Sequence, residues 1–367
     1  MRVLAYGMVG TNRGGIETFL KKMNMNMSRD TIFDYVIEGH TCIHENEICS
    51  LGGKVFFISR RNRNPLKNIF DNYKLLRDLK GSVDVVYFNL SSLSWIAPMI
   101  IARHLGYRVF VHSHNSQFIA ANSCFLYRIV NCINKKWLSH MNVTRLSCSK
   151  PATQFMFEPQ DQVEMIFNAI KISQFAFDKT IRERVRKELK IGEKYVVGFV
   201  GRLSDQKNPL FLPDIMAALL KRCGNAVMLI IGDGDMRSQL EKKIEILGLT
   251  KQCRVLGNRT DVNEIMQAMD VFLLPSEHEG LPYVVIEAQT AGLKCVVSDV
   301  ITEEVNVSGN VHFLSLNCGV VVWAENLIDC LKNPVSDRRK MAAFMAATDF
   351  NIENEAKRLE RILRGPL

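Results

Sequence analysis

Short apolar runs alternate with longer stretches of mixed polarity along the whole chain. In the first half the apolar runs predict strands, and the mixed stretches repeat apolar residues at the spacing of a helix. The predicted strands are 2–6, 35–37, 54–58, 84–88 and 108–112, and the predicted helices are 16–25 and 93–105. The segment Ser147-Cys148-Ser149 is predicted to end this sheet. Strands that alternate with helices are typical of a parallel α/β domain.

The same alternation starts again after residues 168–192, where regular strand signals lapse and a linker is predicted. The second set of predicted strands is 194–200, 227–231, 253–256, 271–274 and 294–298, with helices at 209–221, 236–247, 262–269 and 284–290. We therefore predict two nucleotide-binding-type α/β domains, 1–170 and 171–345. The tail 352–363 is amphipathic, and we expect a C-terminal helix within 346–367 to pack back on the first domain.

Composition places the chain among globular proteins of a reducing compartment. Hydrophobic residues make up 47% and charged residues 23% of its 367 residues, enough for full cores. The ten cysteines form no C-x-x-C pair, which favours free thiols over a disulfide framework. Met1 to Gly7 runs straight into a glycine-rich turn, so no signal peptide is predicted. The longest apolar stretch, 93–102, is too short to cross a bilayer, and we expect a cytoplasmic protein.

The net charge of +9 is concentrated in one part of the first domain. Residues 51–157 hold fifteen Lys and Arg against three Asp, a balance of +12, so the rest of the chain sums to −3. Three interpretations stay open: a solvated basic surface, contact with an anionic membrane, or nucleic acid. Aromatic and aliphatic residues between Phe118 and Trp137 interleave with Arg128, Lys135 and Lys136, as in an interfacial helix. No nucleic-acid-reading motif accompanies the charge, and nucleic acid is not predicted as a partner.

Polar residues and a glycine follow the first strand of the second domain. Gly201 ends the strand, Arg202 and Lys207 lie on the loop, and Asn208-Pro209 has the pattern of an N-cap followed by Pro at the first helical position. Ligands of parallel α/β sheets bind at the carboxyl ends of strands. Two cations and a helix N-terminus there suit a diphosphate. Alone, the same residues also fit two solvent-facing cations.

Two carboxylates, Glu279 and Glu287, stand eight positions apart around another predicted strand-to-helix loop. Glu279 is followed by Gly280, whose missing side chain lets backbone amides approach a ligand. Glu287 falls on the following helix. Carboxylates accept and amides donate hydrogen bonds, so the loop suits sugar hydroxyls. On its own the pair also fits a helix-terminal carboxylate and one exposed acid.

The opening loop of the first domain weakens a dinucleotide-dependent oxidoreductase as an interpretation. Residues 7–15 lack the G-x-G-x-x-G spacing. With the next strand taken to end at Ile37, no acid terminates it to bind a ribose.

Taken together, these segments resemble the glycosyltransferases of family four, retaining enzymes with the GT-B fold. The matching stretches are Gly14-Gly15-Ile16-Glu17, His112-Ser113-His114-Asn115, Gly201-Arg202-Leu203 with Lys207-Asn208-Pro209, Ile231-Gly232-Asp233-Gly234, and Glu279-Gly280-Leu281-Pro282 with Glu287-Ala288. The resemblance covers nearly the whole chain, and its wider pattern is most similar to transferases of bacterial capsular and extracellular polysaccharides. It departs after Ser298-Asp299, where bulkier and acidic residues replace a glycine-rich stretch. The fold it implies is two Rossmann-like domains facing each other across a cleft.

The resemblance also implies residue roles. The implied catalytic residues are His114, Arg202, Lys207 and Glu279, with His112 as the alternative cleft histidine. The implied donor-binding residues are Gly14, Gly15, Gly201, Arg202, Lys207, Glu279, Gly280, Leu281 and Glu287. Among these, Arg202 and Lys207 would hold the donor diphosphate, Glu279 the donor sugar, and Glu287 the ribose.

The function that this resemblance implies is transfer of a sugar from a nucleotide-diphosphate sugar to a polysaccharide or lipid-linked glycan, with retention. No cofactor and no metal are expected, because the two cations take the place of a divalent ion. A lipid-diphosphate acceptor at the inner face of the membrane fits the basic first domain and Arg60, Arg61 and Arg63. A nucleotide-sugar epimerase of the same fold and a non-catalytic sugar-nucleotide-binding protein stay as alternatives.

Overall fold

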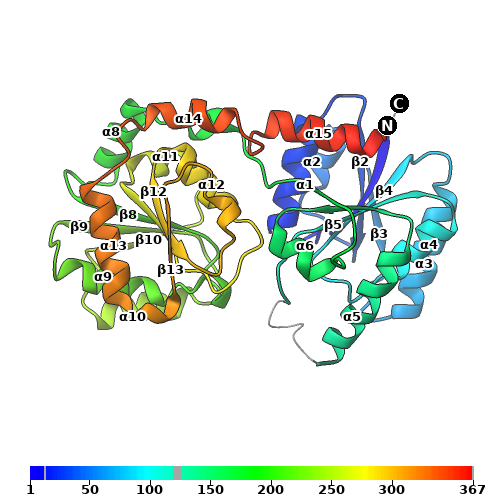
Figure 1. The fold of residues 1–367 in the computed structure, drawn as a ribbon, viewed down its shortest axis with the longest axis horizontal. Helices are drawn as coiled ribbons and strands as arrows, with labels where there is room; N and C mark the ends of the chain where they lie inside the picture. Colours follow the sequence, from blue (N-terminus) through cyan, green and yellow to red (C-terminus); the bar gives the residue numbers. More distant parts are fainter. Residues whose placement is uncertain (12–13, 119–124, 366–367) are drawn as a thin grey trace. The chain divides into compact units, whose positions relative to one another are not determined.

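The computed structural model describes residues 1–11, 14–118 and 125–365, which form two compact domains (Figure 1). The N-domain is Met1–Asn168 together with the segment that starts at Ile352, and the C-domain is Ala169–Asn351. The predicted division after residue 170 lies two residues from the observed one. The C-domain continues six residues beyond the predicted 345, so the segment that returns to the N-domain starts at 352.

The N-domain is built on a seven-stranded sheet in the order β3-β2-β1-β4-β5-β6-β7, and each pair of neighbouring strands is parallel. Its strands are β1 (Arg2–Tyr6), β2 (Ile32–Glu38), β3 (Val55–Ile58), β4 (Val85–Leu90), β5 (Arg108–Ser113), β6 (Thr144–Ser147) and β7 (Val163–Met165). Its helices are α1 (Gly15–Asn26), α2 (Glu45–Ser50), α3 (Pro65–Asp78), α4 (Ala97–His104), α5 (Phe125–His140), α6 (Lys150–Met156) and α15 (Ile352–Arg364). The prediction that the sheet ends near Ser147 was wrong, because the three-residue strand β7 is too short to leave an apolar pattern.

The C-domain repeats this plan with six parallel strands in the order β10-β9-β8-β11-β12-β13. The strands are β8 (Tyr195–Val200), β9 (Ala226–Ile231), β10 (Cys253–Gly257), β11 (Val271–Leu274), β12 (Lys294–Ser298) and β13 (Val311–Leu314). The α-helices are α7 (Ile172–Phe175), α8 (Lys179–Glu188), α9 (Phe211–Leu220), α10 (Arg237–Ile246), α11 (Val262–Ala268), α12 (Tyr283–Thr290), α13 (Val320–Lys332) and α14 (Arg339–Ala346). Helices α7 and α8 occupy the predicted linker, which was therefore an incorrect interpretation of a largely polar helical segment.

Both sheets are covered by helices on their two faces, as parallel sheets require. Figure 1 shows α1 and α15 on one side of the N-domain sheet and α3 and α4 on the other. All six residues of β9 are buried, which explains its continuous apolar sequence. In the C-domain α9 packs on α13, where Phe211 meets the fully buried Trp323 edge-on with ring centroids 5.8 Å apart.

The C-terminal helix packs on the N-domain, as the amphipathic tail predicted. Helix α15 lies against α1, and its buried Glu360 accepts hydrogen bonds from the hydroxyls of Ser28 and Thr31. Burial by itself raises the pKa of the Glu360 carboxyl, but the bonds from Ser28, Thr31 and Arg364 outweigh it and lower that pKa to about 2. The helix is thus fixed by polar contacts as well as by its apolar stripe.

Two features of the structure bear on the compartment of the protein: the state of its cysteines and the apolarity of its helices. The nine cysteines in the described ranges, which leave out Cys124, are all free thiols. Across those same ranges, none of the helices combines the length and the apolarity that crossing a bilayer needs.

Candidate functional site

The C-domain site lies where β8 and β11 run side by side in the middle of the sheet. The chain adds strands outward from β8 in one direction and from β11 in the other, so this is the topological switch point of the domain. Ligands of open α/β sheets bind in the crevice at the carboxyl ends of such strands. The loops that follow β8 and β11 carry Arg202, Lys207 and Glu279, so the structure brings together the predicted residues of both motifs.

Glycine fixes the loop after β8 against the loop after β9. Gly232 has a φ of +135°, and a Cβ at this position would lie only 1.9 Å from the carbonyl oxygen of Gly201. A Cβ on Gly234 would lie 2.4 Å from the carbonyl oxygen of Leu203. Backbone bonds join the same loops, with the Leu203 amide donating to the Asp233 carbonyl at 3.0 Å. Only glycine permits this approach, which holds the backbone around Arg202 in place.

Lys207 and Glu279 form a buried ion pair across the switch point. The Lys207 Nζ donates to Glu279 Oε1, and the Ser276 hydroxyl donates to the same oxygen at 2.8 Å. The Lys207 and Glu279 side chains are only 16% and 8% exposed, so water screens the pair weakly. The two loops are also joined by the Glu277 amide, which donates to the Gln206 carbonyl at 2.8 Å. The pair is therefore preformed without a ligand.

The remaining predicted residues of the C-domain lie on the same two loops and on α12. Arg202 is exposed, and within the described ranges no hydrogen bond or ion pair of its side chain occurs, which leaves the guanidinium available to an anion. Gly280 and Leu281 lie on the loop before α12, and Leu281 is buried. Glu287 is half-buried on α12, with its backbone carbonyl accepting from Ala291 at 3.0 Å. Within the described ranges, no cluster of three or more His, Cys, Asp and Glu side chains is arranged to hold a metal ion.

The predicted helix cap after Lys207 was wrong. Asn208 has a φ of +49° and ends a short 3-10 helix at Asp205–Lys207, and α9 starts only at Phe211. Asn tolerates the left-handed conformation better than most residues, which explains why it stands at this turn. The positive end of α9 therefore does not begin beside Lys207, and the cations rather than a helix terminus are the charges at this loop.

His112 and His114 lie in contact at the end of β5 in the N-domain, with their rings tilted by 32° to each other. Their ring centroids are 4.1 Å apart, and Phe19 packs edge-on against both rings. His114 Nε2 donates to Asn89 Oδ1 at 2.9 Å, and His112 Nδ1 bonds the Tyr87 hydroxyl at 2.6 Å. Burial lowers the pKa of His114 to about 3, and burial together with the neighbouring His114 lowers the pKa of His112 well below its usual value. Both rings are therefore neutral at physiological pH. His112 is fully buried, whereas His114 keeps a small exposed edge.

Gly14 and Gly15 mark the start of α1. Gly14 is the N-cap residue and Gly15 the first helical residue, and a Cβ on Gly15 would meet no neighbour. The buried Glu17 accepts from the amide of Val9 at 2.9 Å and from the amide of Gly14 at 3.0 Å. This carboxylate therefore joins the residues after β1 to the start of the helix.

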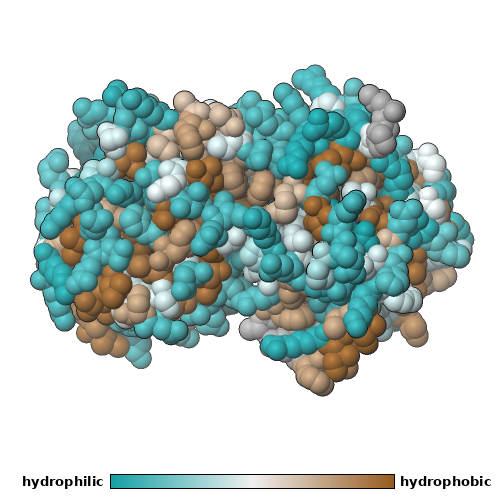
Figure 2. Space-filling model, viewed as in Figure 1, coloured by the Kyte–Doolittle hydropathy of each residue, from teal (hydrophilic) through white to brown (hydrophobic). Residues whose placement is uncertain are grey.

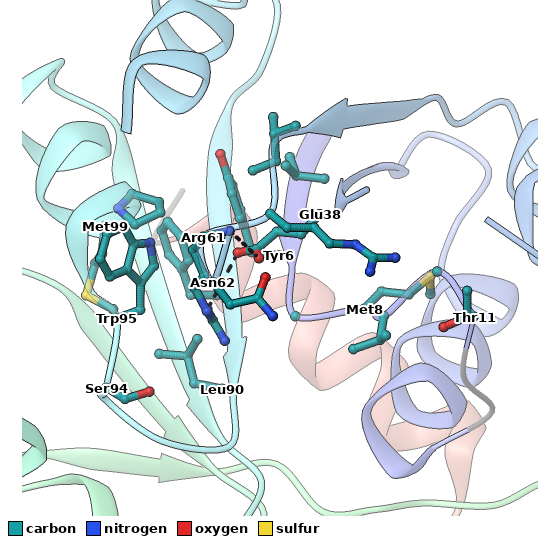
Figure 3. Close-up of a pocket in the computed structure, with 18 of the residues that line it drawn as sticks. Tyr6, Met8, Thr11, Glu38, Arg61, Asn62, Leu90, Ser94, Trp95 and Met99 are labelled. Carbon is teal, nitrogen blue, oxygen red and sulfur yellow. Dashed lines mark hydrogen bonds and ion pairs between the residues drawn. The ribbon is translucent and has the colours of Figure 1, made fainter. Parts of the chain in front are cut away.

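A pocket of about 520 Å³ opens at the carboxyl ends of β1 to β4 in the N-domain. Figure 3 shows Trp95 and Met99 on one side of it and Met8 and Thr11 on the other, with Glu38, Arg61 and Asn62 between them. The lining residues come from β1 to β4, the loops after these strands, α4 and α5: Tyr6, Gly7, Met8, Val9, Gly10, Thr11, Val36, Glu38, Thr41, Ile58, Arg60, Arg61, Asn62, Phe88, Leu90, Ser94, Trp95, Pro98, Met99 and Tyr127. Apolar walls with a few charged groups are typical of small-molecule sites.

A chain of buried polar groups on α3 fixes two walls of this pocket. The Tyr6 hydroxyl donates to Asn72 at 3.0 Å, and the indole of Trp95 donates to Asn68 at 3.2 Å. Asn72 in turn donates to the Asn68 carbonyl oxygen at 2.8 Å, and both asparagines are fully buried. The aromatic walls are therefore held by satisfied hydrogen bonds rather than by packing alone.

Sequence reasoning missed Glu38, and the statement that no acid ends the second strand was wrong. Strand β2 extends one residue beyond Ile37, so Glu38 is its last residue and faces the pocket. It accepts from the Arg61 amide at 3.2 Å and pairs with the Arg61 guanidinium at 3.6 Å. A strand predicted one residue longer would have found it.

Comparison with known proteins identifies what the chain is similar to. A sequence model described as "Glycosyl transferases group 1" matches residues 181–345. EpsF of Bacillus subtilis (strain 168), described as a glycosyltransferase, is 29% identical over 329 residues, which are 87% of this chain and 85% of EpsF. An Escherichia coli protein named UDP-Gal:alpha-D-GlcNAc-diphosphoundecaprenol alpha-1,3-galactosyltransferase is 30% identical over 276 residues, 70% of this chain and 67% of the relative.

Solved structures support the fold over the whole chain. Anabaena Alr3699/HepE in complex with UDP aligns with a TM-score of 0.82 at 16% identity, covering 99% of this chain and 100% of that protein. WaaG, a glycosyltransferase involved in lipopolysaccharide biosynthesis, aligns with a TM-score of 0.72 at 16% identity, covering 99% and 100%. The two Rossmann-like domains of the GT-B fold, predicted from the motifs, are thereby confirmed.

Proposed function

This chain is a glycosyltransferase that belongs to the group 1 glycosyl transferases, the family that its motifs resemble, and on that premise we propose how it acts. It transfers a sugar from a nucleotide-diphosphate sugar, with retention of configuration, to a lipid-linked glycan or a growing polysaccharide. The observation that carries this proposal is the buried Lys207–Glu279 pair on the loops after β8 and β11, with the exposed Arg202 on the first of these loops. The pair and the guanidinium lie at the carboxyl ends of β8 and β11, where α/β proteins bind nucleotides.

The main requirement of the reaction is to stabilise the negative charge of the leaving group. When the bond between the anomeric carbon and the diphosphate breaks, negative charge develops on the departing nucleotide diphosphate. Lys207, held by Glu279, and the exposed Arg202 are the cations that stabilise this charge, and loss of one such group typically costs about two to three orders of magnitude in turnover. Because they supply the positive charge, the reaction needs no divalent ion.

Glu279 is the candidate for orienting the donor sugar. Lys207 and Ser276 both bind one of its oxygens, so the carboxylate is held in a single orientation. A fixed carboxylate accepts hydrogen bonds from sugar hydroxyls, and the amides near Gly280 and Leu281 supply donors. Glu287, one turn into α12, is assigned to the ribose. His114, neutral and held by Asn89, is the candidate for a hydrogen-bond contact from the N-domain.

The acceptor and the place of action follow from the relatives and the charge. The Escherichia coli relative is named for a diphosphoundecaprenol-linked acceptor. We assign the same class of acceptor here, in capsular or extracellular polysaccharide synthesis. The enzyme then works in the cytoplasm, at the periphery of a membrane. Residues 85–157 contain no acid, which gives this part of the N-domain the sign that anionic lipids attract.

A donor panel tests this function. UDP-, GDP-, ADP- and dTDP-sugars are screened by thermal shift, and we expect one nucleotide class to stabilise the chain by several degrees at saturation. Transfer to a lipid-diphosphate sugar is then measured, with the product anomer assigned by NMR and with EDTA present in a parallel reaction. A product of inverted configuration, or loss of turnover with EDTA, contradicts the mechanism. Release of an epimerised nucleotide sugar without transfer contradicts the function itself.

A further inference from the structure

Helix α5 turns its apolar side to the solvent. Phe125, Leu126, Ile133 and Trp137 are 78%, 65%, 58% and 58% exposed, and Ile129 adds a fifth large apolar side chain to the same exposed group. These positions share one side of a helix, because residues three, four, seven and eight apart lie on one face. Figure 2 shows hydrophobic side chains gathered over this helix. An exposed apolar patch of this extent marks an interaction site.

The side of α5 that faces the domain carries two asparagines together with the fully buried Leu138. Asn131 is buried and accepts from the Leu93 amide at 2.7 Å, and Asn134 donates to the Leu93 carbonyl at 2.6 Å. A helix of a globular domain normally buries its apolar face and exposes its polar one. Helix α5 departs from this rule, because it buries Leu138 but leaves most of its large apolar side chains exposed, and the two hydrogen bonds to Leu93 hold it in that orientation. The apolar face is thus available to a partner rather than to the core.

The charged side chains of α5 itself are all basic, and the acid that α5 contacts, Asp161, has a buried side chain that is paired with Arg145. Arg128 and Lys136 are exposed on α5, and no acidic residue occurs between 85 and 157. A hollow of about 470 Å³ lies at the end of the helix, lined by Ile100, Arg103, His104, Trp137, His140 and Met141. Its lining combines apolar side chains with an arginine and two histidines. A lipid headgroup with a negative charge and an attached acyl chain matches that combination.

We propose that α5 lies in the headgroup region of an anionic bilayer, with its apolar face inserted and its basic residues on lipid phosphates. A second copy of the chain is disfavoured as the occupant, because two such faces would bring like charges together without an acid to pair them. Tyr127 of α5 also lines the N-domain pocket, so the pocket opens beside the docked helix. This last consequence rests on the proposed function: a lipid-linked acceptor reaches the pocket without leaving the bilayer.

Vesicle binding by the full chain, without donor or acceptor, tests the proposal. Vesicles of phosphatidylcholine with about 30% phosphatidylglycerol are compared with pure phosphatidylcholine at about 50 and about 500 mM NaCl. We expect binding at least about tenfold tighter to the anionic vesicles, and weaker binding at high salt. Trp137 emission should shift to shorter wavelength and be quenched by brominated lipid, and Trp137→Phe should remove most of this signal. Equal binding to both vesicles, or no quenching, overturns the proposal.

Matched variants locate the contact. Ile129→Ser/Ile133→Ser and Arg128→Glu/Lys136→Glu should each weaken binding about tenfold or more. The controls carry the same changes on the C-domain: Ile246→Ser/Phe344→Ser, and Lys221→Glu/Lys251→Glu. Controls that weaken binding as much as the α5 variants overturn the assignment to α5. A concentration-dependent dimer that the α5 variants abolish, without vesicle binding, assigns the face to a second copy.

Vesicle binding and sugar transfer can be tested independently of each other. Lys207→Ala should bind vesicles like the unmodified chain, because the residue lies on the other domain. Vesicle binding that is absent in an active transferase overturns only the docking surface. Vesicle binding by a chain that transfers no sugar overturns only the function.

Discussion

The two domains arrange four central strands in the same way but place opposite chemistry at the switch point. In the C-domain, the loops after β8 and β11 form a lysine–glutamate ion pair, and the first of these loops also carries an exposed arginine. In the N-domain, β1 and β4 lie beside a neutral histidine pair and a pocket with aromatic walls. The shared topology therefore provides a place for a ligand, and the loops decide which ligand it is.

The proposed function accounts for this difference by assigning the diphosphate to the C-domain and the acceptor glycan to the N-domain pocket. A diphosphate needs a few charges, and residues 201–207 together with Glu279 supply them. An acceptor glycan offers hydroxyls and ring faces, and these need walls, shape and a few polar groups. The N-domain supplies Trp95 and Tyr6, whose side chains are held by hydrogen bonds to the buried asparagines of α3. The Glu38–Arg61 ion pair adds polar groups to the same pocket.

The largest expected effect is on turnover, and stability should then distinguish the two cations of the C-domain, Arg202 and Lys207. Arg202→Ala and Lys207→Ala should each lower turnover about 10²- to 10³-fold, because each removes charge from the leaving diphosphate. Only Lys207→Ala should also lower the free energy of unfolding, by roughly 2–4 kcal/mol, because it leaves the buried Glu279 without its cation. Steady-state kinetics and denaturant unfolding of both variants measure the contrast.

A rescue variant and a control complete that measurement. Adding Glu279→Gln to Lys207→Ala should restore most of the stability and none of the turnover. Lys221→Ala, an exposed cation elsewhere on the C-domain, should change neither. If Arg202→Ala retains full turnover, the charge-based description of the C-domain site is wrong.

Acidification should next distinguish the domains by stability. Unfolded histidine has a pKa near 6.5, whereas His114 titrates at about 3 when folded, and the pKa of His112 is lowered too. Below about pH 6.5 the unfolded chain therefore binds protons that the folded N-domain does not, and its stability falls as pH falls. From about pH 6 to 5 the two histidines together cost roughly 2–3 kcal/mol. The Glu360 carboxyl, with its lowered pKa, adds a further loss only below about pH 4.5.

Hydrogen exchange resolved by domain measures this prediction. N-domain amides should lose protection between about pH 6 and 5 more steeply than C-domain amides. His112→Gln/His114→Gln should flatten the pH dependence, whatever it does to stability at neutral pH. An unchanged slope in that variant would show that the acid-sensitive groups lie elsewhere.

The motifs of the C-domain contained the two residues that the structure brings together, Lys207 and Glu279, whereas the N-domain pocket was not predicted from the sequence. Arg202 and Lys207 share one loop, and Glu279 follows β11, the strand that pairs with β8. Two short sequence motifs are therefore enough to predict that these side chains lie at the same edge of the sheet. The N-domain pocket is assembled from the loops after four strands and from α5, and no single segment carries its signature. Asn208 was assigned to a helix start because Asn-Pro suits an N-cap, although the left-handed turn it forms also favours Asn.

Missed elements have similarly concrete causes. Helix α8 is charged at most positions and buries only Val185, so it has almost no apolar stripe. Strand β13 has four residues, of which only Val311 is buried, which is too little for a period-two pattern. Glu38 was lost to a boundary error of one residue, the size of error that strand ends normally carry. Tertiary contacts, not local preference, determine all three.

The smallest expected effect concerns the Glu38–Arg61 pair, and it tests the N-domain half of the comparison directly. The two side chains are 33% and 49% exposed, so the ion pair contributes less than about 1 kcal/mol and Glu38→Gln should leave the melting temperature unchanged. If the pocket binds the acceptor, the acceptor KM should rise about 3- to 10-fold, because one hydrogen-bonding carboxylate is lost from the wall. The donor KM should stay constant, and Lys67→Ala, exposed at the start of α3 and outside the pocket, should change neither constant. A rise in the donor KM instead would show that the nucleotide sugar contacts the N-domain pocket. It would contradict the assignment of donor and acceptor to different domains.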